Sequence, residues 1–325
     1  MNAKVVTLGG GTGHYMTLCA CKLIAGVDVT AIVSMADSGG SSGRLRDKYG
    51  ALPPGDVLQC LLALSGLPGD SARTLLRHRF AGGSLEGDNA GNWLLTVLHQ
   101  TTGSFLEAIA YLEQILQISP ECHVLPVTVG SITLHGRSLD GAEIHGEAQF
   151  DELRGMLGDH DRIREVWLKP NALMLGAAAE AIRRADYIIL CPGDLFSSVV
   201  PVLLVGGVVA AIAESRARII AVCNLVTTKG QTDGFTVPEL VDTLEQYLKN
   251  RIDCVLYNTG VLDEQRAEQY AQEDRAYPIP AGDLARLEGR TLRGGDYLSE
   301  PPLVRHSPRK LAGVIAHLIG RSVEG

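Results

Sequence analysis

The chain has 325 residues, of which 46% are hydrophobic and 5% aromatic, and its formal net charge is −8. This length suits one large α/β domain or two smaller ones, with a mainly aliphatic core. The acidic balance argues against nonspecific binding to nucleic acid and to an anionic membrane surface.

The seven cysteines form no Cys-x-x-Cys pair, and most of them lie in apolar runs. This usage predicts buried, reduced thiols in a cytoplasmic protein rather than disulfides or a zinc site. The first residues lead directly into a strand pattern, so we expect no signal peptide.

The first predicted element is a short apolar strand, residues 5–8, which stops at the glycine-rich stretch Gly9–Gly13. An apolar segment with helical spacing follows. A strand, a glycine turn and a helix in this order place free backbone N–H groups at a helix N-terminus, where phosphate binds. The stretch matches neither standard nucleotide fingerprint, because His14 takes the place of a third glycine and no lysine follows Gly13. A tight turn without a ligand is the alternative.

A second predicted strand, residues 27–35, ends next to Asp37, at about the place of a ribose-binding acid in a nucleotide fold. A turn cap would also explain Asp37. Residues 38–56 are rich in Gly, Ser and Pro and predict a long polar loop, which either binds a ligand or lies free at the surface. Asp56 is expected to cap the helix that follows.

Part of this loop, residues 39–43, also fits the Gly-x-Ser-x-Gly pattern of hydrolases. That pattern requires a strand running directly into the first glycine and an apolar helix after the last one. Neither is present, so a serine hydrolase is a distant alternative.

Helical patterns cover residues 71–80 and the segments that follow Asn92 and Ser104. From about residue 121 to 160 the period changes to that of short strands, with a hairpin turn at Asp140-Gly141 and a polar linker at 155–161. His135, His145 and Glu147 alternate along this stretch, and a solvated strand face explains them better than a metal site does. We expect no metal.

After this stretch, strands and helices alternate again. The longest apolar run, residues 199–213, is too short to span a membrane and predicts one buried helix. Polar clusters follow five predicted strands, at 9–13, 37–44, 192–198, 224–228 and 258–260. Carboxyl ends of parallel strands share one edge of a sheet. We therefore predict a single α/β domain over residues 1–325, with a Rossmann-like parallel sheet flanked by helices and a small β-rich insertion at 121–160.

Several motifs together resemble the CofD/YvcK family from residue 5 to about 312. They are GGGTG (9–13), ADSGGSSGRLR (36–46), GALPPGD (50–56), GNWLLTVL (91–98) and RHSPRKLA (305–312). One branch of the family transfers 2-phospho-lactate from a nucleotide diphosphate carrier to a deazaflavin precursor. The other branch, the gluconeogenesis factors, binds UDP-sugars and supports cell shape and wall synthesis on gluconeogenic carbon. The Ser-Gly-rich segment 38–43 resembles the second branch.

The resemblance implies a nucleotide or UDP-sugar ligand, a homodimer and a set of site residues. Phosphates would lie on Gly10, Gly11, Thr12 and Gly13, while Tyr270 and Arg305 would contact the UDP-sugar. The same cleft would include Asp37, Ser41, Ser42, Gly43, Arg44, Asn92, Gly193, Asp194, Ser197, Ser198 and Asn224.

The chain departs from the family pattern at Leu58, Gln59, Asp194, Val202 and Ser307. The losses remove side-chain donors to a phosphate, and Asp194 adds a charge that repels one unless it binds a metal or a ribose hydroxyl. The leading hypothesis is a nucleotide-sugar-binding regulatory protein. The alternative is a phospholactate-type transferase in which Asp37 or Asp56 positions a metal or a nucleophile, and whether the protein is an enzyme stays open.

Overall fold

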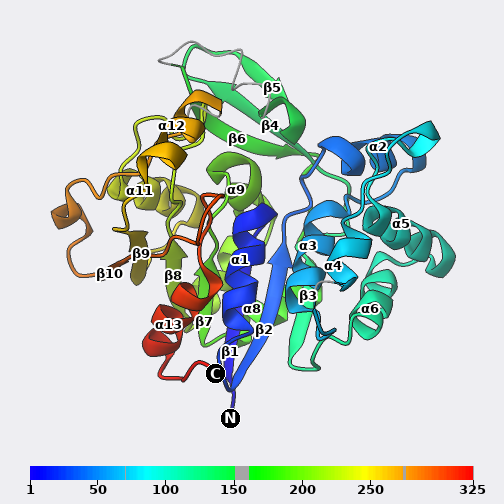
Figure 1. Cartoon of the computed structure of the whole chain (residues 1–325), viewed down its shortest axis with the longest axis horizontal. Coiled ribbons are helices and arrows are strands. Elements are labelled where there is room, and N and C mark those ends of the chain that lie inside the picture. Colours follow the sequence, from blue (N-terminus) through cyan, green and yellow to red (C-terminus); the bar gives the residue numbers. More distant parts are fainter. Residues whose placement is uncertain (70, 151–160, 274–275, 325) are drawn as a thin grey trace.

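The computed structural model describes residues 1–69, 71–150, 161–273 and 276–324 (Figure 1). Its centre is a parallel sheet of seven strands in the order β10-β9-β8-β7-β1-β2-β3. The strands are β1 (Ala3–Gly9), β2 (Val27–Val33), β3 (Cys122–Pro126), β7 (Tyr187–Leu190), β8 (Arg218–Val222), β9 (Cys254–Asn258) and β10 (Thr291–Gly295). The predicted Rossmann-like α/β fold is confirmed.

The strand order reverses direction between β1 and β7. From β1 the chain proceeds to β2 and β3 on one side, and from β7 to β8, β9 and β10 on the other. Ligands of open α/β sheets bind at such a switch point, outside the carboxyl ends of the strands. The two glycine-containing loops at 9–13 and 192–198 both leave the sheet there.

Helices cover the sheet because its central strands are apolar on both faces; Leu8, Ile32 and Ile189 are all fully buried. Helix α1 (Gly11–Cys21) packs against α3 (Gly55–Leu64) and α13 (Pro308–Ile319), and α8 (Gly176–Arg184) packs against β1, β3 and α10. Further helices within the described residues are α2 (Gly40–Tyr49), α4 (Ser71–Leu76), α5 (Ala90–Thr102), α6 (Phe105–Ile115), α9 (Val200–Leu204), α10 (Val208–Glu214), α11 (Val237–Leu248) and α12 (Glu264–Glu273).

A second, antiparallel sheet has the order β5-β4-β6 and lies beyond the carboxyl ends of the large sheet, at the top of Figure 1. Its strands are β4 (Thr133–Ser138), β5 (Glu143–His145) and β6 (Ile163–Lys169). The hairpin turn between β4 and β5 is confirmed by the hydrogen bond from Gly141 N–H to the Ser138 carbonyl. The His135 and His145 Nδ1 atoms lie 2.8 Å apart on its exposed face.

The small sheet therefore does not occupy the span 121–160 that the sequence suggested. Strand β3 begins at Cys122 but pairs in parallel with β2, and β6 pairs with β4 rather than joining the large sheet. Most of the expected polar linker, residues 151–160, lies outside the described residues.

Two predicted segments differ in their local structure. The expected loop 38–56 contains helix α2, which is anchored by the buried Leu45 and ends at Gly50 with a φ of 64°. The expected single helix 199–213 is two helices, α9 and α10, preceded by a wide π-helical turn at Leu195–Val199. The break falls at Gly206, whose backbone bonds like a strand to residues 172 and 174.

Candidate ligand-binding cleft

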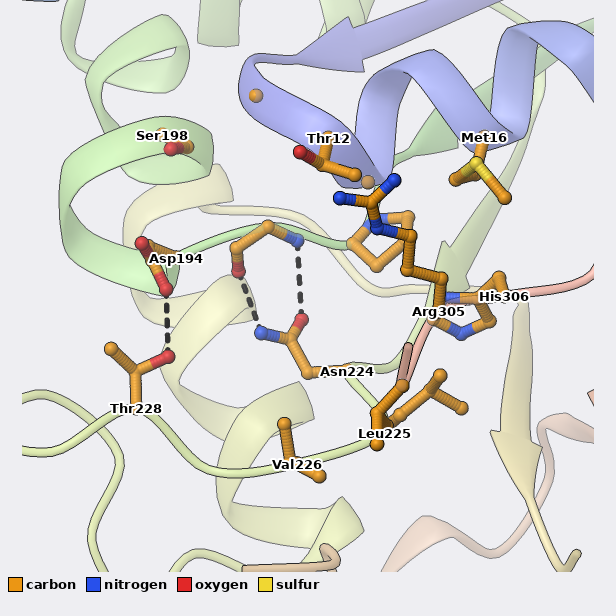
Figure 2. Close-up of a pocket in the computed structure, with 15 residues that line it drawn as sticks. Thr12, Met16, Asp194, Ser198, Asn224, Leu225, Val226, Thr228, Arg305 and His306 are labelled. Atoms are coloured by element: carbon orange, nitrogen blue, oxygen red, sulfur yellow. Dashed lines mark hydrogen bonds between the residues drawn. The ribbon is translucent and has the colours of Figure 1, made fainter. Parts of the chain in front are cut away.

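A cleft of about 240 Å³ opens at the switch point between β1 and β7 (Figure 2). Four segments that lie far apart in the sequence form its walls. They contribute Gly11, Thr12, Gly13 and Met16 from α1; Pro192, Gly193, Asp194 and Ser198 after β7; Asn224, Leu225, Val226 and Thr228 after β8; and Val304, Arg305 and His306 before α13.

The N-terminus of α1 forms one wall of this cleft. Gly11 has a φ of 66°, a left-handed conformation that favours glycine. A Cβ at Gly13 would overlap the carbonyl oxygen of Pro192, so only glycine allows the two loops to approach this closely. First-turn N–H groups have no intrahelical partner, and this wall therefore suits an anion.

A pair of buried carboxylates lies directly behind the glycine loop. Asp56 Oδ1 accepts a hydrogen bond of 2.9 Å from Gly11 N–H. The expected role of Asp56 as a helix cap is wrong, since α3 has Pro54 at its N-cap and no side-chain cap. A Cβ at Gly55 would lie 2.6 Å from both Asp37 Oδ2 and Ser42 Oγ, which shows how tightly this group packs.

The two carboxylates perturb one another. Burial and, to a lesser extent, the negative charge of Asp37 raise the pKa of Asp56 to about 7, against the hydrogen bond from Gly11 N–H, which lowers it. Burial also raises the pKa of Asp37, against the hydrogen bonds that it accepts from Ser42 and Gly39. Folding thus places at least one proton on this pair at mildly acidic pH.

Asn224 and Asp194 organise the opposite wall. The Asn224 side chain accepts from Gly193 N–H at 3.3 Å and donates to the Gly193 carbonyl at 2.7 Å, which fixes the loop after β7. The Thr228 hydroxyl donates to Asp194 Oδ1 at 2.7 Å (Figure 2). Thr228 was not among the predicted site residues, although it ends the polar run 224–228.

The C-terminal segment brings a cation to the cleft. In Figure 2 the Arg305 guanidinium lies beside Thr12 at the N-terminus of α1. The neighbouring His306 is buried, and burial lowers its pKa to about 4 in spite of a hydrogen bond to the Cys223 backbone. His306 is therefore neutral at physiological pH, and Arg305 is the cation among the residues that line the cleft.

Tyr270 supports this segment from behind. Its hydroxyl accepts a 3.0 Å hydrogen bond from Val304 N–H, and its ring packs against the small apolar cluster of Leu225, Leu262, Leu298 and Val304. Tyr270 does not line the cleft in this conformation. It holds the backbone that carries Arg305.

The structure brings part of the predicted set together. Predicted residues that line the cleft are Gly11, Thr12, Gly13, Gly193, Asp194, Ser198, Asn224 and Arg305. Gly10 precedes α1 and lies against Asp56, Asp37 belongs to the buried carboxylate pair, and Ser42 donates a hydrogen bond to Asp37. Gly43 packs against the Ser38 backbone instead.

The remaining predicted residues lie outside the cleft, where they form hydrogen bonds or an ion pair within the protein. Ser41 Oγ accepts from Asn89 N–H at 3.1 Å, and Arg44 pairs with Asp88 at 2.6 Å. Asn92 lies in the first turn of α5, where its N–H is capped by Asn89. Ser197 is buried and accepts from the Gln231 side chain at 3.3 Å.

Sequence reasoning missed several apolar lining residues, namely Met16, Pro192, Leu225, Val226 and Val304, together with His306. Apolar residues of a cleft carry the same pattern as core residues, so no local signal marks them.

Within the described ranges, no helix is both long and apolar enough to cross a bilayer.

A parallel sheet with a glycine loop, a helix N-terminus and an arginine at its switch point defines an α/β protein with a cleft where open α/β sheets hold their ligands. The model of the family "2-phospho-L-lactate transferase CofD" matches residues 5–292, and the chain belongs to this family.

The similarity to curated relatives covers nearly the whole chain. A protein from Thermotoga maritima named "Putative gluconeogenesis factor" is 38% identical over 327 residues, which cover 97% of this chain and 99% of the relative. The "Gluconeogenesis factor" of Bacillus subtilis is 32% identical, with 97% of this chain and 98% of the relative covered. The crystal structure of a UPF0052-family protein from Bacillus halodurans superposes with a TM-score of 0.89 at 34% identity, covering 97% of this chain and 99% of that one.

Proposed function

We propose that this CofD-family protein is a gluconeogenesis factor that binds a nucleotide sugar of the UDP-GlcNAc type in the cleft. It would act in the cytoplasm as a homodimeric regulator that supports cell shape and wall synthesis during growth on gluconeogenic carbon. The names of the similar relatives support the first part of this proposal.

The observation that carries the proposal is the meeting of Arg305 with the N-terminus of α1 in one cleft (Figure 2). A diphosphate has two features that suit this pair. Its oxygens accept hydrogen bonds from helix N–H groups, and its charge favours a guanidinium, which forms strong charge-assisted hydrogen bonds. The apolar side chains of Met16, Leu225 and Val226 offer a surface for the uncharged part of the ligand.

Calorimetry and thermal shift with UDP-GlcNAc, UDP, GDP, GTP and NAD test this function. A ligand present at ~100 times its dissociation constant should stabilise the protein by ~2.7 kcal/mol. The substitution Arg305→Ala should weaken UDP-GlcNAc binding by ~1.5–3 kcal/mol, since it removes a charged hydrogen-bond donor.

The matched control is Arg309→Ala, which removes an exposed arginine from α13, outside the cleft. It should leave the affinity unchanged. Stabilisation by guanine nucleotides but by no uridine ligand would contradict the proposed ligand class. Unchanged affinity in Arg305→Ala would remove Arg305 from the site.

The second candidate is a transferase of the phospholactate type. The buried pair Asp37 and Asp56, directly behind the glycine loop, favours it, because adjacent carboxylates with raised pKa values are frequent where a protein positions a metal or a reacting group. Transfer of the phospholactyl group from a guanosine diphosphate carrier in a direct product assay would establish this activity.

A further inference from the structure

The cleft is polarised between a hydrogen-bond donor end and an acceptor end. At one end, the Arg305 guanidinium, which can only donate, lies beside Thr12 at the N-terminus of α1. At the other end, Asp194 and Thr228 lie next to each other, joined by a 2.7 Å hydrogen bond. Figure 2 shows Arg305 beside Thr12, and Asp194 separately beside Thr228.

The bond between Thr228 and Asp194 decides what the second end can bind. A threonine hydroxyl has one proton, and here that proton is donated to Asp194 Oδ1. Thr228 Oγ can then only accept a further hydrogen bond. The carboxylate also accepts only, and a carboxylate accepts from several donors at once, so a ligand donor can be added to the partners that Asp194 already has. A ligand group at this end must therefore donate hydrogen bonds, and an anionic group there is repelled.

Asn224 holds the loop that carries Asp194 in place, and its contacts are to the protein backbone rather than to a ligand. Its side-chain oxygen and one of its N–H groups are both engaged by the backbone of Gly193, the residue before Asp194. This two-point contact fixes the loop from which the Asp194 side chain projects. Asn224 is accordingly a positioning residue.

We propose that Asp194 and Thr228 bind a vicinal diol of the ligand, and that Asp194 keeps phosphate at the Arg305 end. Acidic side chains at the strand ends of nucleotide folds recognise a ribose hydroxyl in this way. The inference rests on the proposed function, because it assumes a phosphorylated ligand in the same cleft. The diol belongs either to a ribose or to a hexose.

Calorimetry on three ligand pairs distinguishes the two sources. If the diol is that of ribose, the wild type should bind UDP ~10–100-fold more tightly than 2′-deoxy-UDP, and Asp194→Ala should remove most of this preference. If the diol is that of the hexose, Asp194→Ala should instead reduce the preference for UDP-GlcNAc over UDP. GDP against 2′-deoxy-GDP repeats the ribose comparison with another base.

Inorganic pyrophosphate provides the readout that a merely structural role would not give. Asp194→Ala should bind it several-fold more tightly than the wild type does, because a like charge has been removed from the cleft. If the substitution only loosened the cleft, the binding of pyrophosphate would become weaker instead. Thr228→Val should lower the diol preference but leave pyrophosphate binding as it is, and Asp47→Ala, an exposed carboxylate on α2, should change neither.

The outcomes separate the two proposals. Binding of guanosine but not uridine ligands, with a diol preference that depends on Asp194, would refute the uridine class and keep the polarised cleft. Uridine binding with both preferences unchanged in Asp194→Ala, or weaker pyrophosphate binding in that variant, would overturn the role of Asp194. Failure of all these nucleotides to bind the wild type would overturn both.

Discussion

Replacing Asp56 by asparagine should make the protein markedly less sensitive to alkaline pH. Asparagine has nearly the same shape and keeps an oxygen that accepts the Gly11 N–H. It removes the charge and replaces the second oxygen by an NH2 group, which donates as a protonated carboxyl does. Because burial and Asp37 raise the pKa of Asp56 to about 7, the folded protein binds a proton here that the unfolded chain releases near pH 4. Stability is therefore fully present below about pH 4 and is lost as the pH rises through about 7.

The pKa difference sets the size of the effect. A rise from 3.8 to about 7 corresponds to about 4 kcal/mol over the whole titration. Of this, about 2–3 kcal/mol is lost between pH 5 and pH 8. The difference in unfolding free energy between Asp56→Asn and the wild type should move by this amount, in favour of the variant, on going from pH 5 to pH 8.

Urea denaturation at pH 5, 6, 7 and 8 measures this difference. The buried residues His14 and His306, whose pKa values are lowered to about 4, destabilise the protein as the pH falls, but they are present in both proteins and cancel. The control is Asp47→Asn, since the Asp47 side chain is 77% exposed; it should shift stability by less than about 0.5 kcal/mol at every pH. An equal gap between Asp56→Asn and wild type at pH 5 and pH 8 would refute the reasoning.

Three further substitutions or labelling experiments test other parts of the structure. Gly13→Ala should abolish stable folding or cost at least about 3 kcal/mol, whereas Gly313→Ala on α13, where a Cβ meets nothing within 4 Å, should stabilise by about 0.5–1 kcal/mol; thermal unfolding of the two variants compares them. Cys223 should react with a thiol reagent at pH 8 only after unfolding, because burial raises its pKa to about 12, and fast labelling of the native protein would contradict this. Glu245→Gln should lose about 2–4 kcal/mol, since it breaks a largely buried ion pair of 2.9 Å with Arg290, and 1 M salt should not restore the loss in chemical denaturation.

The sequence was most informative about the large sheet. Its strands are continuous apolar runs that end in polar or glycine-rich residues, as at Leu8 and Leu190, and this pattern survives folding because both faces are buried. It could not assign Cys122–Pro126 and Ile163–Lys169 to the correct sheets. Both have strand composition, and the choice of partner depends on long-range pairing that no local pattern records.

Helix α2 could not be predicted from the sequence, for a different reason. It has a mean composition close to that of a loop, and its buried face consists mainly of Ser41, Ser42 and Gly43, with Leu45 as the one large apolar residue. Helix periodicity is read from apolar side chains, so a helix that buries serines and glycines leaves almost no signal. Its polar composition predicts a ligand loop, whereas in the structure Arg44 pairs with Asp88.

The cleft explains why the glycine stretch fits no standard nucleotide fingerprint. In a P-loop, a lysine within the loop supplies the cation and the loop N–H groups hold the phosphates. Here Gly11 N–H is already bound to Asp56, and the cation is Arg305, which folding brings to the loop from the other end of the chain. Fewer loop donors then remain for a phosphate, and the arginine must carry more of the binding energy. Affinity for an anion should for this reason depend more steeply on Arg305 than on any side chain of the glycine loop itself.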